Sequence, residues 1–111
     1  MSVTVESSGT QTAVISTEHE LAKSSLAKAL VLLVDTGAML SGDVLELRVY
    51  AILLTSGAER LQQVASYADV QAEPGKQSVP FPATGKTDGY RVTLKQTAGV
   101  GRAFPWSIVS L

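Results

Sequence analysis

The apolar residues of this chain fall in short runs, and in the clearest run they alternate with polar residues. In the predicted strand Val44–Thr55, every second residue from Leu45 to Leu53 is apolar. Glu46, Arg48 and Tyr50 occupy positions between them. Successive side chains of a strand point to opposite faces, so a period of two indicates a β-strand with one buried face. The chain is therefore expected to fold around β-sheet.

Similar runs recur along the chain, separated by residues that favour turns. Residues 97–102 hold two glycines, which adopt positive φ readily, and residues 56–59 resemble a hairpin turn. The predicted strands are residues 12–16, 26–35, 44–55, 61–70, 89–96 and 104–111. Roughly six to eight short strands, with a turn signal every ~8–12 residues, are typical of an all-β sandwich or barrel.

Residues 18–33 fit two interpretations. Ala22, Leu26 and Leu33 share one helical face, the composition favours helix, and a capping signal precedes the segment. A strand over residues 26–34 agrees better with the β pattern of the rest of the chain. The strand is therefore favoured, and the helix is the alternative.

The length of 111 residues fits one domain. Residues 1–10 are mostly small and polar without periodicity, so we expect a flexible N-terminal arm there and a single β-sandwich domain over residues 11–111. The residues are 45% apolar and only 17% charged, which excludes a disordered chain. So low a charge content also indicates surface that is covered in the working state.

The longest irregular stretch runs from Glu73 to Gly89 and holds three of the four prolines. A loop of this length in a small domain is usually functional or disordered. Phe81, between two prolines, either docks on a partner or packs into the core at a sheet edge. We expect the arm, which could add a strand to a neighbour's sheet, and this loop to contact a partner through Val3, Val5, Gln77, Pro80, Phe81 and Pro82.

No constellation of catalytic or ligand residues emerges from the sequence. There is no cysteine, and the single histidine, His19, would need further ligands to hold a metal. Residues 85–87 (Gly-Lys-Thr) resemble the end of a phosphate-binding loop, but Pro80 stands where that motif needs glycine. The glycines of the 97–102 turn lack the third glycine of a dinucleotide-binding motif, and no Gly-x-Ser-x-Gly occurs. We expect no catalytic, metal or cofactor site, and no enzyme.

Net charge and hydropathy exclude some classes of binding partner. Nine basic and ten acidic residues give a net charge of −1, without the basic excess that suits nucleic acid. The longest apolar run, Ala29–Val34, is far shorter than the ~20 residues of a membrane span, and residues 1–6 lack the features of a signal peptide. We expect no nucleic-acid or membrane partner and no secretion by the general route. Exposed sheet edges in so small a sandwich favour a homodimer or homotrimer.

Two stretches, Gly42–Val49 and Thr93–Trp106, carry a resemblance to a known family. Together with Thr17–His19 and Gln71–Pro74, they resemble a family of small tailed-bacteriophage proteins. The likeness runs from about residue 17 to residue 111, and Thr93–Trp106 is its most specific part.

The resemblance implies a jelly-roll-like β-sandwich of about eight short strands. It also implies a cement, or decoration, protein that binds the outer surface of an assembled icosahedral capsid. The partner would then be the major capsid protein, and the protein would be made in the host cytoplasm and act on the virion. The family offers no catalytic residues. Two other roles stay open: a head–tail or tail structural protein, and a carbohydrate-binding β-sandwich.

Overall fold

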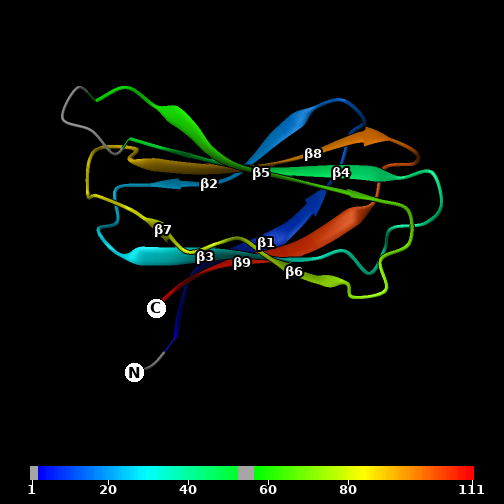
Figure 1. Ribbon diagram of the computed structural model, residues 1–111, viewed down its shortest axis with the longest axis horizontal. Helices are drawn as coiled ribbons and strands as arrows, with labels where there is room; N and C mark the ends of the chain where they lie inside the picture. The colour runs from blue at the N-terminus through cyan, green and yellow to red at the C-terminus, as the bar shows by residue number, and fades with distance from the viewer. Residues whose placement is uncertain (1–2, 53–56) are drawn as a thin grey trace.

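The computed structural model describes residues 3–52 and 57–111, and all regular elements within those ranges are strands (Figure 1). The strands are β1 (Thr4–Thr12), β2 (Glu18–Ser24), β3 (Ala29–Asp35), β4 (Val44–Ala51), β5 (Arg60–Ala68), β6 (Gly75–Gln77), β7 (Phe81–Pro82), β8 (Tyr90–Ala98) and β9 (Ala103–Ser110). The prediction of an all-β fold is confirmed.

The strands form two antiparallel sheets that pack face to face (Figure 1). The first sheet has the order β1-β9-β3-β6, with β7 also paired to β3, and the second has the order β2-β8-β4-β5. Because β6 and β7 pair with different parts of β3, they act as one interrupted strand. Pro80 and Pro82, which cannot donate to a ladder, lie in or beside the second part.

Within this arrangement the strand pairs are nested. β4 pairs with β5, β3 with β6 and β7, β2 with β8, and β1 with β9, all antiparallel. A long ribbon of paired strands that rolls up into two sheets has this order, which is that of a jelly roll. The expected fold class is therefore confirmed.

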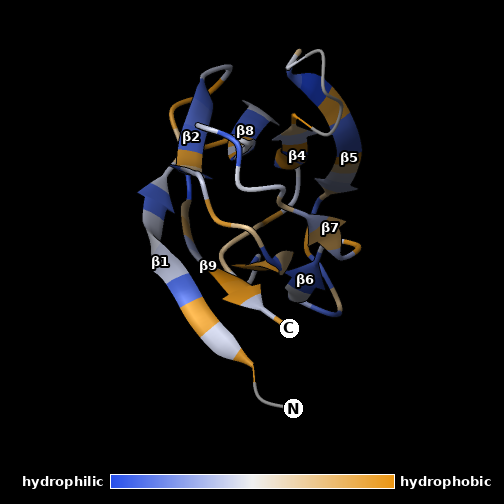
Figure 2. Cartoon of the chain, turned by 90° about the vertical axis from the view of Figure 1, so that its left-hand side faces the viewer, coloured by the Kyte–Doolittle hydropathy of each residue, from blue (hydrophilic) through white to orange (hydrophobic). Residues whose placement is uncertain are grey.

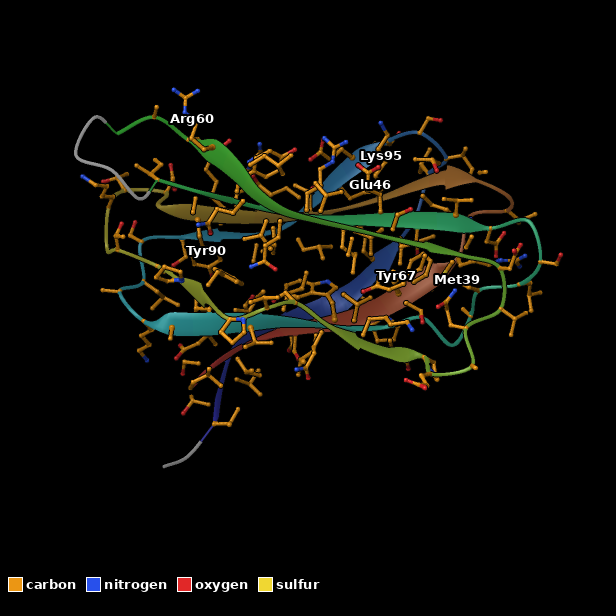
Figure 3. The ribbon with its side chains drawn as sticks, viewed as in Figure 1. Met39, Glu46, Arg60, Tyr67, Tyr90 and Lys95 are labelled. Atoms are coloured by element: carbon orange, nitrogen blue, oxygen red, sulfur yellow. The ribbon has the colours of Figure 1, made fainter. Side chains whose placement is uncertain are left out.

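The core lies between the two sheets and is built by the predicted alternation. In β4 the alternate residues from Leu45 to Ala51 are buried, and in β8 the residues Tyr90, Val92 and Leu94 are buried opposite them. Figure 3 shows Tyr90 between the sheets. From β9, Phe104 and Ile108 enter the core and Trp106 packs against it half-buried, as predicted for one face of that strand; the first sheet also contributes Leu30, Leu32, Val34 and Phe81.

The expected flexible arm over residues 1–10 is wrong for residues 4–10, which belong to β1. This strand pairs with β9 from Thr4 opposite Ser110 to Thr12 opposite Ala103. Backbone pairing holds β1 in place, and its side chains are mostly small, polar and exposed. The sequence of β1 therefore lacks the apolar alternation from which a strand is predicted. The sandwich therefore includes residues 4–10 as well as the described residues from 11 to 111.

The structure also differs from the sequence-based prediction of secondary structure in three other segments. Residues 13–17 form a loop and not the predicted strand 12–16. Residues 18–24 and 29–35 form β2 and β3, so the helical alternative is wrong; pairing with β8 and β9 overrides the helix propensity. The irregular stretch 73–89 contains β6 and β7. Part of the predicted turn 56–59 and the end of the predicted strand 44–55 fall on residues 53–56, outside the described residues.

A buried carboxylate holds the loops at one end of the sandwich together. The side chain of Asp43, which is 1% exposed, accepts hydrogen bonds from the backbone N–H of Leu40 (2.8 Å) and of Val100 (3.1 Å). It also accepts from Nε of Arg102, at 2.8 Å. The Arg102 guanidinium outweighs the effect of burial and, with the two amides, holds the pKa of Asp43 below its usual value. The β3–β4 loop and the β8–β9 turn are thereby joined.

Gln96 extends this buried network to a third loop. Its amide nitrogen donates to the carbonyls of Ala98 (3.0 Å) and Val100 (2.7 Å), and its amide oxygen accepts from the Arg102 N–H at 3.1 Å. The backbone carbonyl of Gln96 accepts from Ser16 in the β1–β2 loop at 2.8 Å. No buried side-chain nitrogen or oxygen among the described residues lacks a hydrogen-bond partner, which a buried network requires.

The close packing of this turn predicts unequal effects of two glycine substitutions. Gly42 and Gly99 have nearly the same positive φ, +90° and +89°, but a Cβ at Gly42 meets no atom within 4 Å. A Cβ at Gly99 would overlap the Asp43 side chain and lie 2.7 Å from its Cα. We expect Gly42→Ala to lower the free energy of unfolding by about 1–2 kcal/mol and Gly99→Ala by more than about 4 kcal/mol, both in urea titrations. Equal losses would contradict the packing described.

The ionised state of Asp43 predicts a pH-dependent contribution to stability. Asp43→Asn should lower the free energy of unfolding by about 3 kcal/mol at pH 7, because three donors lose their charged acceptor. The folded pKa lies below the unfolded value of about 3.9, so this contribution is complete above that value and is lost as pH falls through the folded pKa. The gap between wild type and variant should therefore shrink below about pH 4. Asp88→Asn, at an exposed carboxylate, is the control and should change little.

Candidate binding surface

The outward face of the second sheet is densely charged. Figure 3 shows Glu46 and Lys95 on this side, away from the core, and the register places them opposite each other. Because residues two apart in a strand share a face, the charged side chains of this face include Glu18, Glu20, Lys23, Glu46, Arg48, Arg91 and Lys95.

These charges are compensated within the face. The hydroxyls of Tyr50 (2.7 Å) and Thr93 (2.6 Å) donate to the Glu18 carboxylate. Burial opposes the ionisation of Glu18, but these two donors outweigh it and hold its pKa below the usual value. Arg91 donates to Glu59 at 2.9 Å and lies over the Tyr50 ring, 4.2 Å from its centre. A compensated, hydrated face of this kind is suited to contact with water.

The outward face of the first sheet has a different composition. Val5, Val109 and Val31 form a row across β1, β9 and β3, because each is registered opposite the next. Leu33 and Ser107 form the next row on the same face. In Figure 2, β2 of the second sheet is mostly blue, whereas β9 and the beginning of β1 carry orange. Among the described residues that face outward from this sheet, Asp35 is the only charged one.

A hollow of about 600 Å³ opens on this charge-poor face, between β9, β3 and β6. Leu33 and Gln77 lie opposite each other within it, with Pro105 and Ser107 on one side. Two charged residues line its margin: Asp35, which accepts a hydrogen bond from the N–H of Gly37 at 2.8 Å, and Lys76, whose ammonium lies 4.9 Å from the centre of the Tyr67 ring. The first sheet therefore presents a neutral, hollowed face. We call this the neutral face: the outward side chains of β1, β9, β3, β6 and β7.

Most of the predicted contact residues lie on or beside the neutral face. Val5 faces outward from β1, Gln77 is opposite Leu33, and Pro82 is opposite Ala29, two residues before Val31. Val3 and Pro80, in the segments next to these strands, are exposed. The fold thus brings two segments that are distant in sequence to one side of the molecule.

Phe81 is the exception. It is 1% exposed and packs between the sheets, with its ring centre 5.8 Å from that of Tyr90. The interpretation of Phe81 as an exposed docking residue is therefore wrong, and the core alternative is confirmed. Its pairing with Leu30 in β3 turns the ring inward, while the prolines beside it face out.

The sequence reasoning missed Val31 and Leu33, the central residues of the neutral face. Their signal was present in Ala29–Val34, a run of six apolar residues without alternation. A strand that is apolar on both faces is expected where both faces are covered.

The residues considered for chemistry occupy structural positions. Nε2 of His19 accepts a hydrogen bond from the N–H of Val14, at 3.0 Å, and so orders the β1–β2 loop. Residues 85–87 lie in the connection between β7 and β8, where Gly85 has a φ of +83°. Within the part of the chain that the structure describes, no three His, Cys, Asp or Glu side chains are grouped as metal ligands would be. No helix in residues 3–52 and 57–111 has the length and apolarity that crossing a bilayer requires.

The fold and this surface define the chain as a small jelly-roll β-sandwich with one neutral outer face. Comparisons with family models, with curated proteins and with solved structures gave no match to it.

The position of Phe81 predicts a large loss of stability on truncation. Phe81→Ala removes a fully buried ring and should lower the free energy of unfolding by about 3–5 kcal/mol. Val79→Ala is the matched control, because Val79 is 69% exposed and should change the value by less than about 0.5 kcal/mol. Urea denaturation measures both, and an equal, small effect would place Phe81 outside the core.

Proposed function

We propose that this protein is a non-enzymatic structural protein, a cement (decoration) protein that binds the outside of a tailed-phage icosahedral head. Its partner would be the major capsid protein, and its place the virion surface. The proposal combines the resemblance in Gly42–Val49 and Thr93–Trp106 with the surface described above.

The observation that carries the proposal is the contrast between the two outer faces. The second sheet turns compensated charges outward, whereas the neutral face exposes Val5, half-buries Leu33 and has Asp35 as its one described charge. Depletion of charge at the centre of a patch distinguishes protein interfaces from the remaining surface. The neutral face is therefore the side that we expect to rest on the shell.

The area of the neutral face is consistent with a weak contact that is repeated many times on a shell. Strands β1, β9 and β3, of 9, 8 and 7 residues, with the short β6 and β7, cover roughly 450 Å² at ~3.3 Å per residue and ~4.8 Å between strands. Stable pairwise complexes bury about 800 Å² on each partner. A single contact of this size is weak, but a shell offers the same contact many times, so that stabilisation accumulates over the particle.

The stretches that carry the resemblance converge at one end of the molecule. They contribute Asp43, Gln96, Gly99 and Arg102, the residues of the buried network. This convergence supports a shared fold and leaves the partner to be tested.

The aromatic residues give less support to carbohydrate binding, the other class of function considered. Such modules stack sugars on exposed rings along a groove. Phe81, Tyr90 and Phe104 are buried, and Tyr67 and Trp106 pack against the core. The sixth ring, that of Tyr50, is covered by Arg91.

Binding to phage heads that lack the protein tests the proposal directly. Leu33→Lys places a charge in the hollow of the neutral face and should weaken co-sedimentation with mature heads by at least tenfold, about 1.4 kcal/mol. Val64→Lys adds the same charge on the outer face of the second sheet, at a residue that is 52% exposed, and should leave binding unchanged. Equal binding by both variants, with folding checked by circular dichroism, would reject the neutral face as the contact.

The copy number in purified virions, measured by quantitative mass spectrometry, decides between the roles on the particle. A cement protein is expected at a simple ratio to the major capsid protein. About a dozen copies would instead indicate a head–tail or tail protein, and absence from virions would end the capsid proposal.

A further inference from the structure

The end of the sandwich formed by four loops exposes large aliphatic side chains. This end is at the right of Figure 1. We call it the loop end: residues 13–17, 35–43, 69–74 and 99–102. Its apolar side chains are between 36% and 64% exposed: Val14, Ile15, Leu40, Val70 and Val100.

Direct hydrogen bonds hold these loops side by side. Leu40 and Val100 donate to the two oxygens of one carboxylate, that of Asp43. The Asp43 carbonyl accepts from the N–H of Asp69 at 2.8 Å, and the Asp69 carboxylate accepts from the N–H of Gly42 at 2.7 Å. These bonds place Val70 next to the loop that carries Leu40.

The β1–β2 loop joins the same row. The Arg102 carbonyl accepts from the N–H of Ala13 at 2.8 Å, and Gly101 approaches so closely that a Cβ there would collide with the Ala13 carbonyl oxygen. Val14 and Ile15 therefore lie beside the turn that carries Val100. The aliphatic groups are held in place before any partner arrives, which lowers the entropy lost on binding.

The charge of the loop end is acidic. It contains Asp35, Asp43, Asp69 and Glu73 against a single base, Arg102, for a net charge of −3. The whole chain has a net charge of −1, so the remainder is positive. Arg102 is already paired with the buried Asp43 at 2.8 Å, which leaves Asp35, Asp69 and Glu73 around the aliphatic side chains.

We propose that the loop end is a second docking surface, and that it binds a protein whose aliphatic patch is bordered by lysine or arginine. Nucleic acid needs basic contacts and sugars need exposed rings, and the loop end offers neither. A lipid surface is disfavoured because interfacial segments combine apolar with basic residues. The loop end lies at one end of the long dimension (Figure 1) and borders the neutral face, because Asp35 and Pro74 also line the hollow there. The proposal does not require that the shell contact be correct.

Synthetic peptides test this chemistry without any phage component. The full-length chain, labelled with ¹⁵N, is titrated with an amphipathic helical peptide of leucine and lysine. The two control peptides replace every lysine by glutamate or every leucine by serine. We expect the leucine–lysine peptide to bind at least about tenfold more tightly than either control and to shift the amide signals of the four loops. Binding no tighter than the controls, or shifts centred on other residues, would overturn the proposal.

Variants of the exposed side chains complete the test. Leu40→Ser and Val100→Ser together should weaken binding of the leucine–lysine peptide about tenfold, because two aliphatic contacts are lost. Val64→Ser removes an equally exposed aliphatic side chain elsewhere and should not change it. Unchanged binding by the double variant would overturn the proposal. Binding to zwitterionic lipid vesicles in the absence of peptide binding would also overturn it, in favour of a lipid surface.

Discussion

The burial of one ionised carboxylate, that of Asp43, governs how one end of this protein is built. An uncompensated charge in the interior would destabilise the fold by several kcal/mol, so donors from two connections must meet it together. Leu40, Val100 and Arg102 supply those donors, although they lie in parts of the chain that are distant in sequence. Gly99 is the residue that allows the backbone to come close enough. The aliphatic side chains outside this network therefore occupy fixed positions.

The two sheets share one core and yet present different surfaces to the outside. The second sheet turns most of its charged residues outward, together with Leu61 and Val64 of β5, and Arg48 and Arg91 of this face are paired with Glu46 and Glu59. The first sheet differs in β3, where Val31 and Leu33 point away from the core that Leu32 enters. Val31 and Val109 are only 6% exposed, so what distinguishes this face from that of the second sheet is its lack of charge and not a large exposed apolar area.

The elements that could be predicted are those whose burial differs between their two faces. Strand β4 can be predicted from the sequence because Leu47 faces the core and its neighbour Arg48 faces outward. The same alternation makes β8 predictable. Strand β1 has no such contrast, since backbone pairing to β9 holds it and Gly9 and its polar neighbours bury little. The contact residues were predicted in part: exposure of Val5 followed from its position, but the inward turn of Phe81 depends on pairing with Leu30, a tertiary fact.

The nesting of the strand pairs has a consequence for the order in which the chain can acquire its structure. The β4–β5 pair joins neighbouring strands, whereas each pair outside it closes a longer loop, ending with Thr4 opposite Ser110. The entropy lost on closure grows with loop length. The ribbon therefore loses the least entropy at each step if it assembles from the β4–β5 pair outward. During synthesis β9 is the last of the described strands to leave the ribosome, and until then β1 and β3 lack the strand that lies between them. The neutral face is thus completed only after β9 has left the ribosome.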